Sequence, residues 1–484
     1  MQFIYKLLNI ERNEATRVYI LLGIGFFMGI FLATFTVTSN TLFLSNFNET
    51  TDLPVAFVVS GVIGLIGTYL FSYLQNKWSF RRLSLVFSFI ILLTTIFLYI
   101  LMLWFESSQV PIFIAFAFQS PFAIIILLIF WGIFNRMFNL RQSKRIIGSI
   151  DTGQLIASII AFFTIPIVLK WLAITQQLYF ISAVSMLFCF VFIIISQSFI
   201  KKQDTFATGK KSHSLGIKDF FSNKYLFLMS AFVIVSMVSV AFLDYSFLNV
   251  SGINFEGNET GLATFLSFFD GTIVIFSFLF QTFVTDRIIG TYGLRVALLI
   301  NPILMGIFTV LAVFIGSVFG VEGSENFVFF FIVISMSKLF IDSLKDALDG
   351  PSFKLYFLPI SSSVRFDAQS KIEGMVTVFS GLLSGGLIFL IQKFNFFNLL
   401  LITVALVPII FLWFFVTEKL YKRYRQTLQE ALYRNKSMIN KRSMAIKTLN
   451  NLFHELFETL KEQPKKLLNL LKIIDATEPA MLDD

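Results

Sequence analysis

Four charged residues recur along one face of an otherwise apolar segment between residues 326 and 350. Lys338, Asp342, Lys345 and Asp349 follow one another at i, i+4, i+7 and i+11, the spacing that stacks side chains on one side of a helix. An ionised side chain facing lipid costs about 3 kcal/mol, so this stripe is expected to face a protein interior or a water-filled cavity. The chemistry that such a stripe offers is ion pairing and the binding of charged solutes.

The last residues of this segment have a second interpretation. Lys345, Asp346 and Asp349 would simply be solvated if this end of the helix lies at the membrane surface, whereas Lys338 and Asp342 lie deeper. We expect Lys338 and Asp342 to face a central cavity, within ion-pair reach of each other or of charges on other helices. Transport through a polar pathway in a membrane protein is therefore the first hypothesis.

The composition is that of a membrane protein. Hydrophobic residues make up 56% of the 484 residues, 64 of them are Phe, and the mean hydropathy is +0.80, whereas soluble domains are about half apolar. The net charge of +9 does not indicate nucleic acid, because the basic residues form short clusters between apolar runs. We therefore expect a lipid bilayer and a small molecule as partners, and no nucleic acid.

Residues that carry enzyme chemistry are scarce. Cys189 is the single cysteine and lies in an apolar run, while His213 and His454 both fall in polar segments. A disulfide framework is excluded, and zinc or Ser-His-Asp chemistry is poorly supported. We expect no enzyme activity, no cofactor and no metal site. We expect no cleavable signal at the N-terminus, since its basic stretch leads into a run too long for a signal peptide.

Twelve apolar runs are each long enough to cross the hydrocarbon core, which takes about 20 helical residues. They cover 18–44, 54–75, 84–105, 111–134, 146–170, 177–199, 224–249, 260–284, 295–316, 326–349, 368–391 and 397–416. The fifth opens with Asp151 and Gln154 and the tenth carries the charge stripe, as expected of helices that line a cavity. The sequence thus predicts an all-α polytopic membrane protein.

Alternate connections between these runs carry nearly all of the Lys and Arg. The basic set comprises Lys77, Arg81, Arg82, Arg136, Arg141, Lys144, Arg145, Lys201, Lys202, Lys210, Lys211, Lys218, Arg287, Lys354 and Arg365. The other connections hold none, apart from Lys393 after the eleventh run. This asymmetry predicts that both termini lie in the cytoplasm, and we expect a multi-pass protein of the cell inner membrane.

The basic segment 200–223 divides the chain into six runs and six. Such a linker between two six-helix halves is the layout of the major facilitator architecture. A Gln-Ser-Lys sequence at 142–144, before the fifth run, is repeated at 369–371, before the eleventh. The expected units are an N-terminal half 1–199, the linker 200–223, a C-terminal half 224–416 and a cytoplasmic tail 417–484.

Glycines recur at the spacing typical of close helix contacts. Gly61, Gly64 and Gly67 lie in the second run, and Gly381 and Gly385 lie in the eleventh. Small residues let membrane helices approach closely. Packing is therefore the expected role of these five positions, ahead of any part in binding a ligand.

The tail contains an amphipathic pattern. Apolar residues between 449 and 460 repeat at i, i+3, i+4, i+7, i+8 and i+11, as on one face of a helix. Pro464 ends this pattern, and a second apolar stretch follows. We expect residues 426–484 to be helical and cytoplasmic, and to dock on the transporter's own loops or on another protein. The apolar face is expected to present Leu452, Phe453, Leu456 and Phe457.

Three stretches of the chain resemble a known family. They are the Phe130-Trp131 pair with Asn135 and the segment 140–158, the segment 280–302, and the segment 355–385 with Tyr356, Pro359, Arg365 and Gly374. Together they resemble the bacterial and plastid nucleotide transporters, the ATP/ADP translocase family, including relatives with a helical extension after the last span. The likeness covers most of residues 10–416.

The resemblance implies exchange or uptake of nucleotides, coupled to a counter-nucleotide or to protons. Fixed cations suit phosphate groups because they supply donors and a permanent charge. Lys338 and Lys345 are the candidates in the cavity, and Lys144, Arg145 and Arg365 are the candidates at the cytoplasmic mouth. Arg145 and Arg365 each precede a cavity-lining helix in its own half, so we also expect them to form equivalent contacts between the halves.

The chain also departs from this family. Nucleotide exchangers place a lysine in the first span, whereas residues 18–46 contain no charge. The tenth run carries as many acids as bases, and Asp244 and Asp270 add two more carboxylates. A cavity with as many acids as bases is poorly suited to binding ATP. The resemblance therefore supports the fold more strongly than the substrate.

Two roles are possible for the carboxylates that lie within the predicted membrane spans. Asp244, Asp270, Asp342 and Asp346 are candidate coupling sites for a proton or cation, or structural partners of the lysines. Asp270 has no basic neighbour in its own helix, which favours coupling. Three functions remain: a transporter of nucleotides or related anions, a proton-coupled facilitator for another solute, and a non-transporting anchor that holds a partner through its tail.

Overall fold

The computed structural model describes residues 14–75, 77–105, 108–138, 140–172, 174–200, 220, 222–321, 327–393 and 398–460. Side chains are described for most of these residues. The backbone alone is described for 434–460 and for several positions between 140 and 152.

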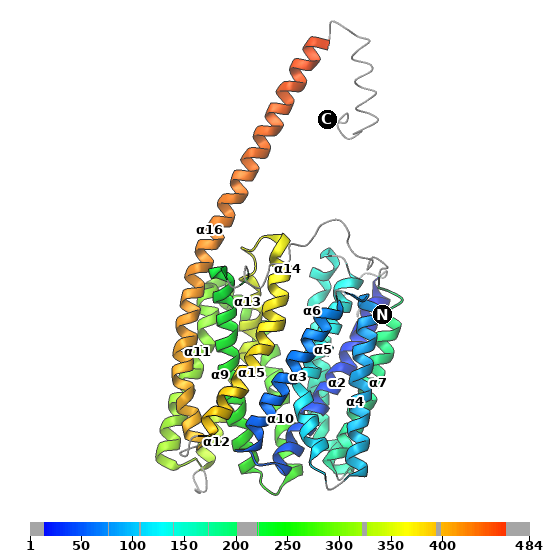
Figure 1. Ribbon diagram of the computed structural model, residues 1–484, viewed down its shortest axis with the longest axis vertical. Helices are drawn as coiled ribbons and strands as arrows, with labels where there is room; N and C mark the ends of the chain where they lie inside the picture. Colours follow the sequence, from blue (N-terminus) through cyan, green and yellow to red (C-terminus); the bar gives the residue numbers. More distant parts are fainter. Residues whose placement is uncertain are drawn as a thin grey trace. The chain divides into compact units, whose positions relative to one another are not determined.

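Within the described residues, twelve helices are long and apolar enough to cross a membrane. The elements are α2 (Ala15–Asn46), α3 (Asp52–Gln75), α4 (Phe80–Trp104), α5 (Val110–Met137), α6 (Leu140–Leu172), η1 (Thr175–Gln177), α7 (Leu178–Ser196), α9 (Lys224–Asn254), α10 (Glu259–Phe283), α11 (Thr285–Phe319), α12 (Phe327–Leu344), η2 (Lys345–Asp349), α13 (Gly350–Leu355), α14 (Ser362–Ser370), η3 (Lys371–Val376), α15 (Thr377–Gln392) and α16 (Leu399–Leu460). The predicted all-α polytopic fold is confirmed. Figure 1 shows α2 to α7 in blue to cyan and α9 to α15 in green to yellow.

Two helices extend well beyond the predicted runs. The ninth run was expected over 295–316, but α11 begins at Thr285 and bends at Gly293, whose φ of 79° is the left-handed conformation that glycine adopts without a Cβ clash. The twelfth run was expected to end at 416, but α16 continues to Leu460. Polar sequence ends an apolar run but does not end a helix, because Lys, Arg, Gln and Glu are good helix formers.

The chain divides into two compact units. One contains residues 1–358 and 362–422, and the other contains residues 359–361 and 423–484. The second unit includes the later part of α16, which is helical as predicted for the start of the tail. The side chains of the expected apolar face and residues 461–484 lie outside the described residues, so docking through 426–484 stays a prediction.

The two halves of the first unit meet along several pairs of helices. Helix α3 packs on α15, α6 on α10, and α2 on both α9 and α10. Ser267 of α10 donates a hydrogen bond to the carbonyl oxygen of Phe162 in α6. These contacts bring α9, α10 and α15 of the second half against helices of the first half, and α12 packs on α9 and α10.

Two glycines permit the close contact between α3 and α15. A Cβ added at Gly61 would lie 2.7 Å from Leu382 Cα, and one added at Gly385 would lie 2.9 Å from the backbone nitrogen of Val58. Real Cβ atoms do not approach backbone so closely, so only glycine fits at either position. The expected packing role therefore applies to Gly61 and Gly385, whereas a Cβ at Gly381 would meet nothing within 4 Å.

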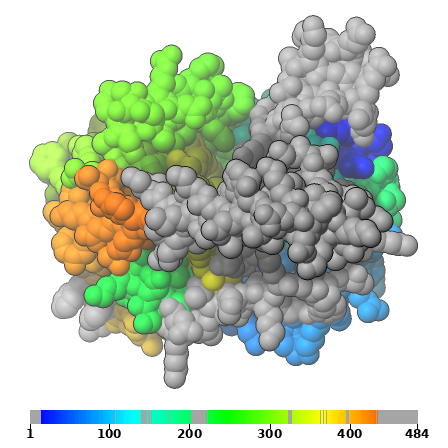
Figure 2. Space-filling view, turned by 90° about the horizontal axis from the view of Figure 1, so that it is seen from above, coloured from blue at the N-terminus to red at the C-terminus, as the bar shows by residue number. Residues whose placement is uncertain are grey.

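Helix α11 and the first part of α16 lie side by side, as the light green and orange surfaces in the view from above show (Figure 2). Arg295 of α11 forms a 2.7 Å ion pair with Glu418 of α16. Both residues lie outside the cavities described below, and this pair is partly solvated, so its contribution to stability is at most about 1 kcal/mol.

Candidate functional site

Three cavities lie inside the bundle and share lining residues. Their volumes are about 430, 470 and 300 Å³, and Val240 and Lys345 line all three. The largest is lined by both halves, with Asn40 and Gln119 from the first half and Ser384 from the second. A cavity between the two halves, lined with polar side chains, is where a solute would cross the membrane.

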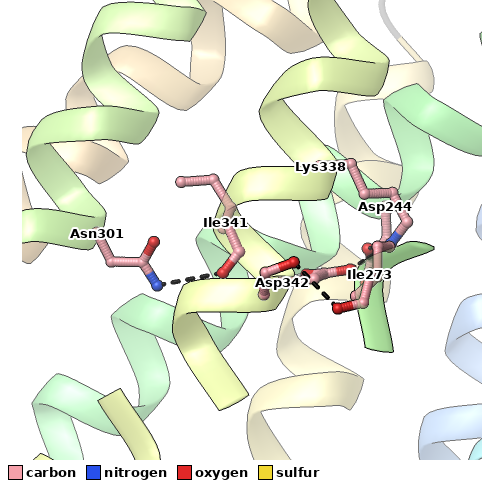
Figure 3. A network of polar contacts seen from close by, with 7 residues as sticks. Asp244, Ile273, Asn301, Lys338, Ile341 and Asp342 are labelled. Carbon is pink, nitrogen blue, oxygen red and sulfur yellow. Dashed lines mark hydrogen bonds and ion pairs between the residues drawn. The ribbon is translucent and has the colours of Figure 1, made fainter. Parts of the chain in front are cut away.

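A buried ion-pair network lies at the centre of this system. Lys338 Nζ lies 2.5 Å from Asp244 Oδ1 of α9 and 2.7 Å from Asp342 Oδ2, one turn along α12. The lysine also lies 5.4 Å from the ring centroid of Phe247. The Lys338 side chain is only 13% exposed. Figure 3 shows the lysine between the two carboxylates. The expected ion-pair geometry of Lys338 and Asp342 is therefore present, and Asp244 joins it from another helix.

Three charged groups of the cavities, Asp270, Lys345 and Lys354, lack a direct partner among the described residues. Asp270 of α10 and Lys345 of η2 both line the two cavities that also contain Asp244. The structure gives neither of them a hydrogen bond or an ion pair with a described side chain. An unpaired carboxylate and an unpaired ammonium thus face the same space, where each is available to a proton, an ion or a solute.

The last charge of the expected stripe, Asp349, is buried and not solvated at the membrane surface, and it lines one of the cavities together with Lys345. The helix changes to a π turn, η2, from Lys345 to Asp349. Asp349 is buried and its Oδ2 accepts a 2.7 Å hydrogen bond from Asn301 Nδ2 of α11. The same amide of Asn301 donates to the carbonyl of Ile341 (Figure 3).

The described side chains that line the three cavities carry more acid than base. The acids are Asp244, Asp270, Asp342, Asp346, Asp349 and Glu373, and the bases are Lys338, Lys345 and Lys354. Lys338 is paired with two carboxylates, and Lys354 lines only one of the cavities, whereas Lys345 lines all three and has no ion-pair partner among the described residues. This excess of acid favours solutes of low negative charge over polyanions.

The remaining predicted site residues lie away from these cavities or outside the described side chains. Arg365 Nη2 donates a 2.8 Å hydrogen bond to the carbonyl of Leu358 in the same half. Lys144 and Arg145 belong to α6, but their side chains lie outside the described residues. The expected contact of Arg145 and Arg365 between the halves therefore stays a prediction, as does a binding role for all three.

Sequence reasoning missed the residues of α11 that contact the π turn. Asn301 donates to Asp349, and Thr285 Oγ1 donates a 2.7 Å hydrogen bond to the carbonyl of Ala347. A lone Asn in the apolar run before Pro302 was the available signal, because a polar side chain in a membrane helix needs a partner. Its partner comes from another helix and was therefore not readable from the sequence.

No protein-family model matches the chain, and no curated protein matches its sequence. Solved structures do match its fold. A mutant form of the nucleoside transporter NupG superposes with a TM-score of 0.62 at 13% identity, over 84% of this chain and 99% of its own. The fold is of the major facilitator type.

Two further solved structures show the same architecture. The inward-open xylose transporter XylE from E. coli has a TM-score of 0.55 at 12% identity, over 84% of this chain and 96% of its own. The POT family transporter PepTSo has a TM-score of 0.58 at 12% identity, over 84% and 98%. The chain thus shares the fold of these structures, and its twelve apolar helices are those of a multi-pass membrane protein. Its likeness to the nucleotide transporter family stays a prediction.

Proposed function

We propose that this chain is a secondary transporter that carries a small anionic metabolite together with protons by alternating access. The observation that carries the proposal is the pair of unpartnered charges, Lys345 and Asp270, on the cavities between the two halves. The ammonium supplies a site for one anionic group, and the carboxylate supplies a site for a proton. The solved structures of similar fold are named as transporters, which supports the general class.

The charge balance of the cavities narrows the substrate. Six acids against three bases among the described lining residues oppose a solute with several negative charges, because like charges in a low dielectric repel strongly. A solute with a single carboxylate or phosphate group fits Lys345 better. A nucleoside monophosphate is therefore the first probe, and a nucleoside is the neutral comparison.

Nucleotide exchange is the second candidate function. It is supported by the resemblance of the segment 355–385 to the nucleotide transporters and by the presence of Lys345 and Lys354 on one cavity. Under this alternative, ATP on one side of a liposome membrane drives entry of labelled ADP without a pH gradient. Under the first proposal, a pH gradient drives net uptake.

Replacing Asp270 with Asn is expected to abolish uptake driven by a pH gradient while leaving exchange of substrate for substrate largely intact. The amide keeps the size and polarity of the side chain but does not bind a proton at the pH values of a transport assay. Purified protein in liposomes, loaded with and without unlabelled substrate, separates the two activities. Asp286→Asn, an exposed change in the first turn of α11, is the matched control. Loss of exchange and of driven uptake together would show that Asp270 is structural.

Replacing Lys345 with Ala is expected to raise KM for a monoanionic substrate about 10- to 100-fold, since a hydrogen bond to a charged group contributes about 1.5–3 kcal/mol. The KM of a neutral nucleoside, if it is carried, should change little. Lys419→Ala, whose ammonium lies over the ring of Phe415 outside the cavities, is the control. An unchanged KM for every anion tested would remove Lys345 from the binding site.

A further inference from the structure

The π turn Lys345–Asp349 has hydrogen-bond partners outside its own helix. A π turn replaces the i to i+4 hydrogen bonds of an α-helix with i to i+5 hydrogen bonds, and such turns are found frequently at functional sites. The described side chains that donate to this turn and to the end of α12 come from α11. Thr285 Oγ1 donates to the carbonyl of Ala347 at 2.7 Å, and Asn301 Nδ2 donates to the carbonyl of Ile341 at 3.4 Å.

The same Asn301 amide also holds a carboxylate. Its Nδ2 lies 2.7 Å from Asp349 Oδ2, and Asn301 is fully buried while Asp349 is 7% exposed. This contact turns Asp349 toward α11. The other oxygen of Asp349 has no hydrogen-bond partner among the described residues, so the donor of Asn301 is the principal contact that keeps this carboxylate in place.

Asp349 is also a potential partner of Lys345. An acid and a base four residues apart on a helix can form an ion pair, and Lys345 and Asp349 have that spacing and line the same cavity. Nevertheless, Lys345 forms no ion pair with Asp349 or with any other described residue. The hydrogen bond from Asn301 therefore gives the Asp349 carboxylate a partner on α11 in place of the ammonium.

We infer that Asn301 and Thr285 are positioning residues for substrate binding. By holding the π turn and drawing Asp349 to α11, they keep Lys345 free for the anionic group of the solute. This inference rests on the proposed function, in which Lys345 binds that group. Neither residue touches the solute, and both act through the carboxylate of Asp349.

The test combines transport with second-site rescue. Asn301→Leu should raise KM for the anionic substrate about tenfold, equivalent to about 1.4 kcal/mol, because Asp349 then competes for Lys345. Adding Asp349→Asn should restore KM, since the competing charge is gone. If the hydrogen bond between Asn301 and Asp349 served folding alone, the double variant would lose both of its members and its KM would not be restored.

The Thr285 variants test the second contact. Thr285→Val should raise KM as Asn301→Leu does, and Thr285→Ser, which keeps the hydroxyl group, should have the KM of the unaltered protein.

A second measurement reports the charge around residue 345 without any substrate. The only cysteine, Cys189, is buried, so Lys345→Cys can be labelled selectively with anionic and cationic methanethiosulfonate reagents. Asn301→Leu should lower the ratio of anionic to cationic labelling rates about tenfold, and Asp349→Asn should restore it. Thr309→Val, a buried change on the same helix, is the control and should leave the ratio unchanged.

The two measurements separate the possible failures. If the labelling ratio responds as expected but no anion shows a changed KM, the positioning role stands and the assignment of Lys345 to the substrate is wrong. If Asn301→Leu and Thr285→Val leave the labelling ratio unchanged in folded protein, the positioning role is overturned. A KM raised by Asn301→Leu and not restored by Asp349→Asn overturns it as well.

Discussion

Replacement of Lys338 with Met is expected to abolish transport and to destabilise the protein by about 3–5 kcal/mol, the cost of removing one member of a buried ion pair. Met fills a similar volume but leaves the carboxylates of Asp244 and Asp342, at 2.5 and 2.7 Å from the former ammonium, without their cation. The two acids would then repel each other inside the membrane. Thermal unfolding of detergent-solubilised protein measures the loss, and liposome flux measures the activity.

The control for this prediction neutralises the whole network. In the triple variant Lys338→Met, Asp244→Asn and Asp342→Asn no charge is left unpaired, and replacing a buried ion network by neutral groups is often nearly neutral for stability. We expect the triple variant to regain most of the thermal stability and none of the transport. Unaltered stability of Lys338→Met alone would show that water reaches the network well enough to make the pairing dispensable.

Replacement of Gly385 with Val is expected to reduce flux at least tenfold, because it forces apart the two halves where α3 meets α15. The new side chain would begin with a Cβ only 2.9 Å from the backbone nitrogen of Val58 and 3.0 Å from the carbonyl carbon of Phe57. Backbone atoms cannot rotate away as a side chain can, so the helices themselves must shift. Overpacking of this kind costs about 1–3 kcal/mol.

The neighbouring glycine offers a matched control for this contact. A Cβ at Gly386, the next residue of the same helix, would meet nothing within 4 Å, so Gly386→Val makes the same chemical change without the clash. Flux in liposomes and thermal stability should both be close to those of the unaltered protein. Equal losses in Gly385→Val and Gly386→Val would indicate a general effect of Val on α15 and contradict the role of the α3–α15 contact.

The arrangement of charges explains why the two helices α10 and α12 are central to the proposed mechanism. Asp270 of α10 lies on the same cavities as the Lys338 network of α12, and α10 also contacts α6 of the other half through Ser267. A change in the charge of Asp270 would therefore act beside a contact between the two halves. Under the proposed function, a proton on Asp270 would act on alternating access through this contact.

The sequence by itself determined the membrane-spanning architecture. Twelve apolar runs of sufficient length demand twelve helices, because backbone polar groups in lipid must be satisfied within each segment. It also determined the pair Lys338–Asp342, since residues four apart on a helix are neighbours whatever surrounds them. Length and local spacing are properties of one segment, and they do not depend on how the segments pack.

Only the tertiary structure decided which charges are partnered and which are free. Asp244 pairs with Lys338 although 94 residues separate them, and Asp349 accepts a hydrogen bond from Asn301 of α11 although 48 residues separate these two. Similarly, Gly61 and Gly385 face another backbone whereas Gly381 does not. In each case the outcome depends on donor groups and backbone atoms of a neighbouring helix, whose position the local pattern of the sequence does not contain.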